Sequence, residues 1–109
     1  MNPKPISVRD PASRDIAGIL DRYWFDASPQ VARAFAVALR QSFQHLSQFP
    51  STGSSRYSGD TPFPNLRSWP VAGFPFLILY VEEASSVDVY RVLHTARDIP
   101  ASLRQDMEE

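Results

Sequence analysis

Hydrophobic residues with helical spacing mark two long segments in the first half of the chain. Apolar side chains recur there every three or four positions, which is the repeat of one face of an α-helix. The first stripe consists of Ala12, Ile16, Ile19, Leu20, Tyr23 and Trp24, and the second of Phe35, Ala38, Leu39, Phe43 and Leu46. We therefore expect two amphipathic helices that bury these stripes in a shared core.

The ends of both helices are marked by residues that favour helix starts and stops. Asp10-Pro11 and Ser28-Pro29 each combine an N-cap residue with a proline at the first helical position. Pro50 ends the second segment, which runs from about residue 30 to residue 48. The short break between the helices predicts an antiparallel helical hairpin.

Four segments have the residue types and lengths of β-strands. These are residues 6–9, 66–71, 76–82 and 87–94. Pro70 marks the second as an edge strand or as the site of a bulge, whereas the nearly uniform apolar run of the third predicts a central strand covered on both faces. In the last strand Val87, Val89, Arg91 and Leu93 alternate with Asp88, Tyr90, Val92 and His94, which predicts one apolar and one more polar face.

The order of the predicted elements is β-α-α-β-β-β-α, with a tail helix at about residues 100–107. This order predicts an α+β fold in two layers, with the helical hairpin on one face of a small, mostly antiparallel sheet. Residues 1–109 are expected to form a single domain. The one long irregular stretch, residues 51–64, is rich in Ser, Gly, Pro and Asp, and we expect a mobile loop there.

Composition excludes several classes of protein. The 109 residues are 43% hydrophobic and carry a net charge of −1, which suits a packed globule and disfavours a general nucleic-acid binder. The chain has no cysteine, so disulfides, thiolate zinc sites and cysteine nucleophiles are excluded. The longest apolar run, residues 76–81, is far too short to span a membrane, and the N-terminus lacks the apolar core of a signal peptide. We expect a cytoplasmic protein.

Residues that could carry chemistry are concentrated at the end of the last strand. His45 and His94 fall on different elements without metal-ligand spacing, and the four glycines form no phosphate-binding motif, so no metal or cofactor is expected. The dense region comprises Tyr90, Arg91, His94, Arg97 and Asp98, with Arg67 from a neighbouring strand. Two interpretations stay open: the arginines stabilise the fold while Asp98 caps the tail helix, or they bind a partner.

Aromatic residues at the end of the first helix form a second candidate surface. Trp24 is expected in the core stripe, and Phe25 lies on its shoulder. An exposed aromatic shoulder on a helical hairpin could receive a partner helix, although ordinary packing also accounts for both residues.

Four ordered strings resemble the RelE/ParE superfamily of small bacterial toxins, and the ParE branch in particular. They are "PASRDIAGILDRYW", "ARAFAVALRQSFQHLSQFPSTG", "LRSWPVAGFPFLILY" and "VYRVLHTARDIPASL". Each string alone is weak, but the combination in this order is specific. The first strand and the loop over residues 54–65 contribute little.

The resemblance implies the toxin of a type II toxin–antitoxin module, with a role such as plasmid stabilisation. Such a toxin is neutralised by an antitoxin, often of the ParD type, whose C-terminal segment wraps it. Characterised ParE toxins act on DNA gyrase, whereas RelE relatives cleave mRNA on the ribosome. A hetero-oligomer with a ParD-like antitoxin is therefore expected, with DNA gyrase as the target and without direct DNA binding or membrane association.

Two features of the sequence favour the ParE branch: the residue at one position, and the scarcity of lysine. The ribonuclease branch has a basic cluster and a tyrosine that follows the arginine at the exit of the last strand. Arg97 matches that arginine, but the tyrosine position holds Leu103, and Lys4 is the only lysine. Because activation of a ribose hydroxyl needs a proton donor or acceptor, we expect no enzymatic activity. A ribosome-dependent mRNA endonuclease, supported by His94 beside the arginines, stays as the alternative, and so does an inactive homologue that still binds antitoxin.

The predicted antitoxin- or target-binding residues belong to the two surfaces described above. They are Arg67, Arg91, His94, Arg97, Trp24 and Phe25, and no catalytic or metal-binding residue is expected. We expect the antitoxin segment to follow the helical hairpin and to reach the sheet, where arginines such as Arg67 and Arg91 face its acidic or carbonyl groups.

Overall fold

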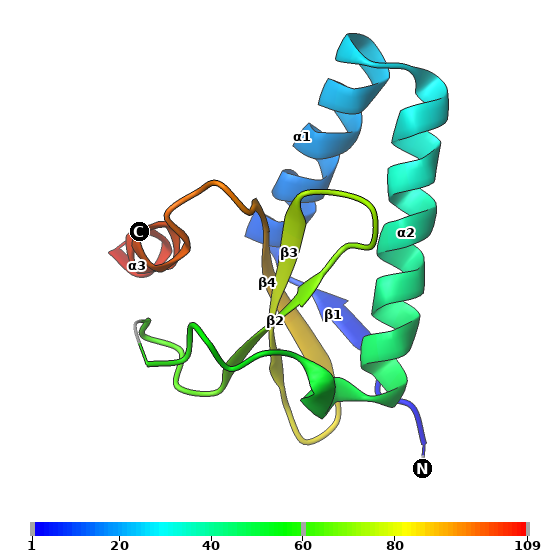
Figure 1. Cartoon of the computed structure of the whole chain (residues 1–109). Helices are drawn as coiled ribbons and strands as arrows, with labels where there is room; N and C mark the ends of the chain where they lie inside the picture. The colour runs from blue at the N-terminus through cyan, green and yellow to red at the C-terminus, as the bar shows by residue number, and fades with distance from the viewer. Residues whose placement is uncertain (1, 60, 109) are drawn as a thin grey trace.

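The computed structural model describes residues 2–59 and 61–108. Its elements follow the predicted β-α-α-β-β-β-α order, with a short 3₁₀ turn, η1, added after the second helix. They are β1 (Ile6–Val8), α1 (Asp10–Asp26), α2 (Pro29–Gln48), η1 (Pro50–Thr52), β2 (Leu66–Pro70), β3 (Phe76–Glu82), β4 (Val87–His94) and α3 (Ile99–Glu108). The helical hairpin of α1 and α2 packs on one face of the sheet, and α3 lies on the other side (Figure 1). The predicted α+β class is confirmed.

The helix starts agree with the proline signals, with one shift. Ser28 caps α2 as predicted, because its hydroxyl accepts a hydrogen bond of 3.2 Å from the Val31 N–H. The N-cap of α1 is Arg9, so Asp10 already belongs to the first turn and the predicted Asp10 cap is wrong by one residue. A carboxylate in the first turn still interacts favourably with the positive end of the helix dipole.

The sheet has the strand order β1-β4-β3-β2. β3 pairs antiparallel with β2 and β4, whereas β1 pairs parallel with β4, from Ile6 opposite Val87 to Val8 opposite Val89. The sheet is therefore mixed and mostly antiparallel, as expected. β2, which ends at Pro70, is an edge strand, and β3 is central; both positions confirm the sequence-based assignments.

A bulge corrects the predicted alternation of β4. Leu79 pairs with Arg91 and Tyr80 pairs with Val89, so Tyr90 is an extra residue in the ladder. Val87, Val89 and Val92 pack on the helical side, whereas Leu93 packs on the opposite side. The predicted apolar face of Val87, Val89, Arg91 and Leu93 is therefore wrong beyond the bulge, since an inserted residue changes which side later residues face.

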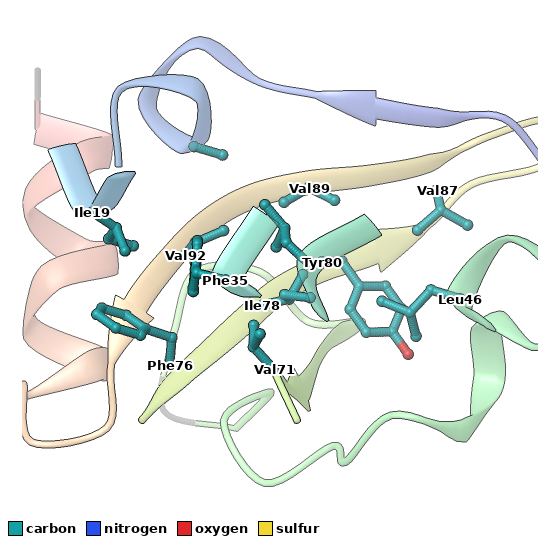
Figure 2. Packing of buried hydrophobic residues seen from close by; sticks show 12 residues of the cluster. Ile19, Phe35, Leu46, Val71, Phe76, Ile78, Tyr80, Val87, Val89 and Val92 are labelled. Carbon is teal, nitrogen blue, oxygen red and sulfur yellow. The ribbon is translucent and has the colours of Figure 1, made fainter. Parts of the chain in front are cut away.

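Hydrophobic side chains fill both sides of the sheet. Between the sheet and the hairpin, Phe35 of α2 and Ile19 of α1 pack with Ile78, Tyr80 and the valines of β4 (Figure 2). On the other side, Ile99 and Leu103 of α3 pack with Leu66, Leu79 and Leu93. The tail helix thus adds a partial third layer to the expected two-layer fold. Burial of aliphatic and aromatic surface on both faces of β3 is the main stabilising contribution in such a fold.

The irregular segment after α2 is attached to the sheet by a buried hydroxyl. The Tyr80 hydroxyl donates to the Pro50 carbonyl at 2.6 Å and accepts from the Gly53 N–H at 3.0 Å. Gly53 is required here, because a Cβ at this position would overlap the Tyr80 ring and hydroxyl. Beyond it, Ser54 forms an isolated antiparallel bridge with Ser68. The start of the predicted loop is therefore fixed by specific contacts, while its mobility stays a prediction.

Candidate partner-binding site

Arg91 forms an ion pair within the protein. Its Nε and Nη2 donate to the two carboxylate oxygens of Asp15 on α1, at 2.7 and 3.0 Å. The Val92 N–H donates to the same carboxylate at 3.0 Å, and both side chains of the ion pair are mostly buried. This bidentate pair connects α1 to β4 just after the bulge. Arg91 thus has a structural role in the free protein, and its predicted contact with antitoxin stays a prediction.

Arg67 also has a partner within the chain. Its Nη1 donates to the Gly53 carbonyl at 2.8 Å, beside the buried Tyr80 hydroxyl. The guanidinium thereby stabilises the segment between α2 and β2. A charge reversal at Arg67 or Arg91 would break a contact within the fold. A loss of antitoxin affinity in such a variant could therefore come from lower stability as well as from a lost contact with the partner.

His94 and Arg97, by contrast, line an open depression between α1 and the end of β4, which we call the α1–β4 hollow. Two adjoining spaces of about 360 and 190 Å³ make up this hollow and share Ile19, Arg22, Phe76 and His94 as lining residues. Arg14 and Arg97 line only the smaller space. The His94 ring packs edge-on against Phe76, and its Nδ1 accepts a hydrogen bond of 3.0 Å from the Ala96 N–H. In the neutral ring the proton therefore lies on Nε2.

Trp24 and Phe25 lie elsewhere, in what we call the hairpin groove. This groove of about 460 Å³ is lined by these two residues of α1 together with Leu20, Asp21, Ala32, Arg33 and Ala36. Trp24 is 46% exposed and Phe25 is 80% exposed, so the assignment of Trp24 to the core stripe is wrong. The reason is geometric: the neighbouring Tyr23 takes the place in the core, where its ring contacts Phe74 and Phe76, whereas Trp24 lines the groove. Of the two interpretations given for Phe25, the exposed shoulder agrees with this exposure, and ordinary packing does not.

The Arg33 guanidinium lies 5.8 Å from the Trp24 ring centroid, within the range of a cation–π interaction. An apolar floor beside an arginine and two exposed aromatic rings is the composition typical of protein-binding surfaces. The hairpin groove is thus suited to an amphipathic segment of a partner.

The structure thus divides the six predicted residues among three locations. The hairpin groove contains Trp24 and Phe25, the α1–β4 hollow contains His94 and Arg97, and Arg67 and Arg91 bind groups of the fold. Sequence reasoning missed Arg14 and Arg22, which line the hollow from α1. Their signal was present: with Gly18, they recur every four residues and so share one helix face.

The position that would distinguish a ribonuclease is part of the core. Leu103 is fully buried against Leu66, Leu79 and Leu93. Asp98, in contrast, accepts a hydrogen bond of 3.1 Å from the Ala101 N–H, which confirms its predicted role as a cap of the tail helix. The stretch after Arg97 therefore serves to anchor α3 on the sheet.

Two side chains outside both surfaces have shifted pKa values. Burial raises the pKa of the Tyr80 hydroxyl. The pKa of Arg9 is raised mainly by the hydrogen bond that the Arg9 guanidinium donates to Asp88. Both groups hold parts of the fold together.

Within residues 2–59 and 61–108 no group of three or more His, Cys, Asp or Glu side chains could hold a metal ion. Over the same part of the chain, no helix combines the length and the hydrophobicity needed to cross a bilayer.

The α+β fold of this chain is shared with a protein of known structure. The chain is similar to a protein from the chromosomal ParDE toxin–antitoxin system of P. aeruginosa, with a TM-score of 0.69 and 18% sequence identity. The similarity covers 84% of this chain and 95% of that one. A comparison with curated proteins finds no match.

The family model described as the ParE toxin of the type II toxin–antitoxin system parDE matches residues 6–99. The chain belongs to this family. This confirms the resemblance drawn from the sequence, and it implies an antitoxin partner.

Proposed function

We propose that this protein is the toxin of a ParDE-type module, that a ParD-type antitoxin neutralises it, and that it inhibits DNA gyrase by binding without catalysing a reaction. The family match over residues 6–99 carries this proposal. Two features of the molecule support it: the exposed aromatic residues of the hairpin groove, which suit a protein partner, and the buried Leu103.

The absence of a phenol at position 103 supports binding over catalysis. General acid–base catalysis needs a titratable group within hydrogen-bond reach of the reacting atoms. Leu103 has neither a proton nor a hydrogen-bonding group, and its side chain contacts the apolar core. A net charge of −1 also suits a protein target better than extended contact with an RNA backbone.

A supercoiling assay tests the gyrase proposal. Purified toxin at a stoichiometric excess should inhibit supercoiling of relaxed plasmid by gyrase, and an equimolar amount of the antitoxin encoded next to it should restore it. In cells, induction of the toxin alone should cause filamentation and DNA-damage signalling. Unchanged supercoiling with folded toxin would contradict the gyrase proposal. Induction without growth arrest would identify an inactive homologue.

The hairpin groove provides a matched pair of variants. Phe25→Ala removes an 80% exposed ring at the groove, whereas Val37→Ala removes a 48% exposed side chain of α2 that does not line it. Neither should change stability by more than about 0.5 kcal/mol, because both side chains are largely exposed. If the groove binds a partner, Phe25→Ala should weaken antitoxin or gyrase binding and Val37→Ala should not.

One observation favours the second candidate, a ribosome-dependent mRNA endonuclease. His94 lines the same hollow as Arg14, Arg22 and Arg97, so an imidazole shares this space with three guanidinium groups. Primer extension on mRNA from expressing cells decides between the two candidates. Discrete cuts within translated codons that His94→Gln abolishes would establish the endonuclease, and intact mRNA during growth arrest would exclude it.

A further inference from the structure

The α1–β4 hollow has an excess of positive charge that the protein itself does not neutralise. Arg14, Arg22 and Arg97 line it, all three are exposed, and within the described ranges none of their side chains forms a hydrogen bond or an ion pair. Of the two carboxylates that line it, Asp15 is already neutralised by Arg91, which leaves Asp26 in the larger space. Three guanidinium groups around one depression repel one another, so an anion bound among them would be stabilised.

Gly18, in the part of α1 that lines the hollow, is a glycine that the fold itself does not require. It lies inside α1 between Arg14 and Arg22, and it lines the hollow. Its φ is not positive, and a Cβ built there would meet no atom within 4 Å. Neither backbone conformation nor packing therefore requires glycine, although glycine within a helix costs about 1 kcal/mol relative to alanine. A ligand that approaches the α1 backbone would account for it.

The floor of the hollow is apolar, which restricts the chemistry of the ligand. Ile19 and Phe76 line both spaces, and Tyr23 and Ala27 line the larger one. A carboxylate can pair bidentately with a guanidinium at the rim, while a neighbouring aliphatic or aromatic group covers the floor. The near-neutral net charge and the compact shape of the hollow favour this ligand over a nucleic-acid strand, which needs an extended basic surface.

We propose that the α1–β4 hollow is a second anchoring site for the antitoxin, which binds an acidic side chain flanked by an apolar one, with the carboxylate held by Arg14, Arg22 and Arg97. This proposal rests on the proposed function. It assigns the electrostatic contact with the antitoxin to these arginines in place of Arg67 and Arg91, which already bind groups of the fold.

Titration calorimetry with the purified antitoxin encoded by the adjacent reading frame tests the site. Arg14→Gln, Arg22→Gln and Arg97→Gln should each weaken binding by roughly tenfold, as expected for loss of a hydrogen bond between charged groups. Arg40→Gln removes an exposed arginine of α2 that lies outside the hollow, and it should change affinity less than twofold. The wild-type affinity should also fall more steeply with salt than that of the Arg14→Gln/Arg22→Gln variant.

A steric pair of variants tests the same site without changing charge. Gly18→Leu places a side chain in the hollow and should weaken binding at least tenfold. Ala17→Leu adds a larger side chain at the adjacent exposed position of α1, which does not line the hollow, and should have little effect. Because leucine is a better helix former than glycine, Gly18→Leu should melt no lower than the wild type, so lost binding cannot be attributed to unfolding.

The possible outcomes separate this site from the function on which it rests. A normal complex that neither the arginine nor the Gly18 substitutions weaken overturns the hollow as an antitoxin site and leaves the proposed function intact. If wild-type toxin forms no complex with the adjacent gene product, both proposals fail. Arginine-dependent binding of a 12-nucleotide single-stranded RNA, with antitoxin affinity unchanged, would assign the hollow to nucleic acid and also overturn the proposal.

Discussion

Removal of the Tyr80 hydroxyl should destabilise the protein far more than loss of a single oxygen atom suggests. Tyr80→Phe deletes the hydrogen bonds to the Pro50 carbonyl and from the Gly53 N–H. Each contributes about 0.5–1.5 kcal/mol, and a buried polar group left without a partner costs about 1–3 kcal/mol. Gly53 is buried, so water cannot readily replace the lost acceptor. The expected loss in the free energy of unfolding is about 2–4 kcal/mol.

Urea unfolding followed by circular dichroism measures this loss, and Tyr23→Phe is the matched control. Tyr23 also packs in the aromatic core, but within the described residues its hydroxyl forms no hydrogen bond, so its removal should cost less than about 0.5 kcal/mol. For a domain of this size, Tyr80→Phe should lower Tm by roughly 10–20 °C. Equal stability of Tyr80→Phe and the wild type would refute the assignment of the hydroxyl as the anchor of the segment after α2.

The same hydroxyl predicts a pH dependence of stability. Burial raises the pKa of Tyr80 above its ordinary value of 10.0. The folded state therefore keeps its proton where the unfolded chain loses it, and stability falls as pH rises above about 10. Wild-type protein should lose stability between pH 9 and about 11 more steeply than Tyr80→Phe, whose residue 80 does not titrate. Parallel pH profiles would contradict this explanation.

Three further substitutions test the structural assignments. Asp15→Asn should cost about 1.5–3 kcal/mol in unfolding free energy, because Arg91 loses its charged partner, whereas Asp21→Asn on the exposed side of α1 should be nearly neutral. Trp24→Ala should cost less than about 1.5 kcal/mol by the same measurement, since the ring is 46% exposed; a loss above 3 kcal/mol would place it in the core. Leu103→Tyr should cost about 1–3 kcal/mol through overpacking and should yield no mRNA cleavage by primer extension.

Local signals in the sequence predicted most of the fold. The Ser28-Pro29 pair predicted the start of α2, and Pro70 limited the second strand to an edge or a bulge, because both signals depend on the backbone of adjacent residues; the structure places β2 at the edge. The bulge at Tyr90 could not be predicted in this way, since it depends on how β4 registers against β3. For the same reason, the alternation of β4 failed beyond that residue.

The candidate site was harder to predict because exposure and pairing depend on distant parts of the chain. Arg91 and Arg97 look alike in sequence, yet Arg91 faces Asp15 from α1 whereas Arg97 lies at an open hollow. Trp24 matched the apolar repeat of α1, but the repeat does not show which of the adjacent residues Tyr23 and Trp24 packs in the core. Arg14 and Arg22 became candidates only when the fold placed them beside His94.

The parallel pairing of β1 with β4 has a consequence for the order of events during translation. Ile6 is synthesised long before its partner Val87, because most of the helices and strands lie between them in the sequence. The nascent polypeptide therefore cannot complete its four-stranded sheet until residues 87–89 have left the ribosome, because two distant segments pair only when both have been made. β1 thus has no strand to pair with until the helical hairpin and the strands β2 and β3 have all been made.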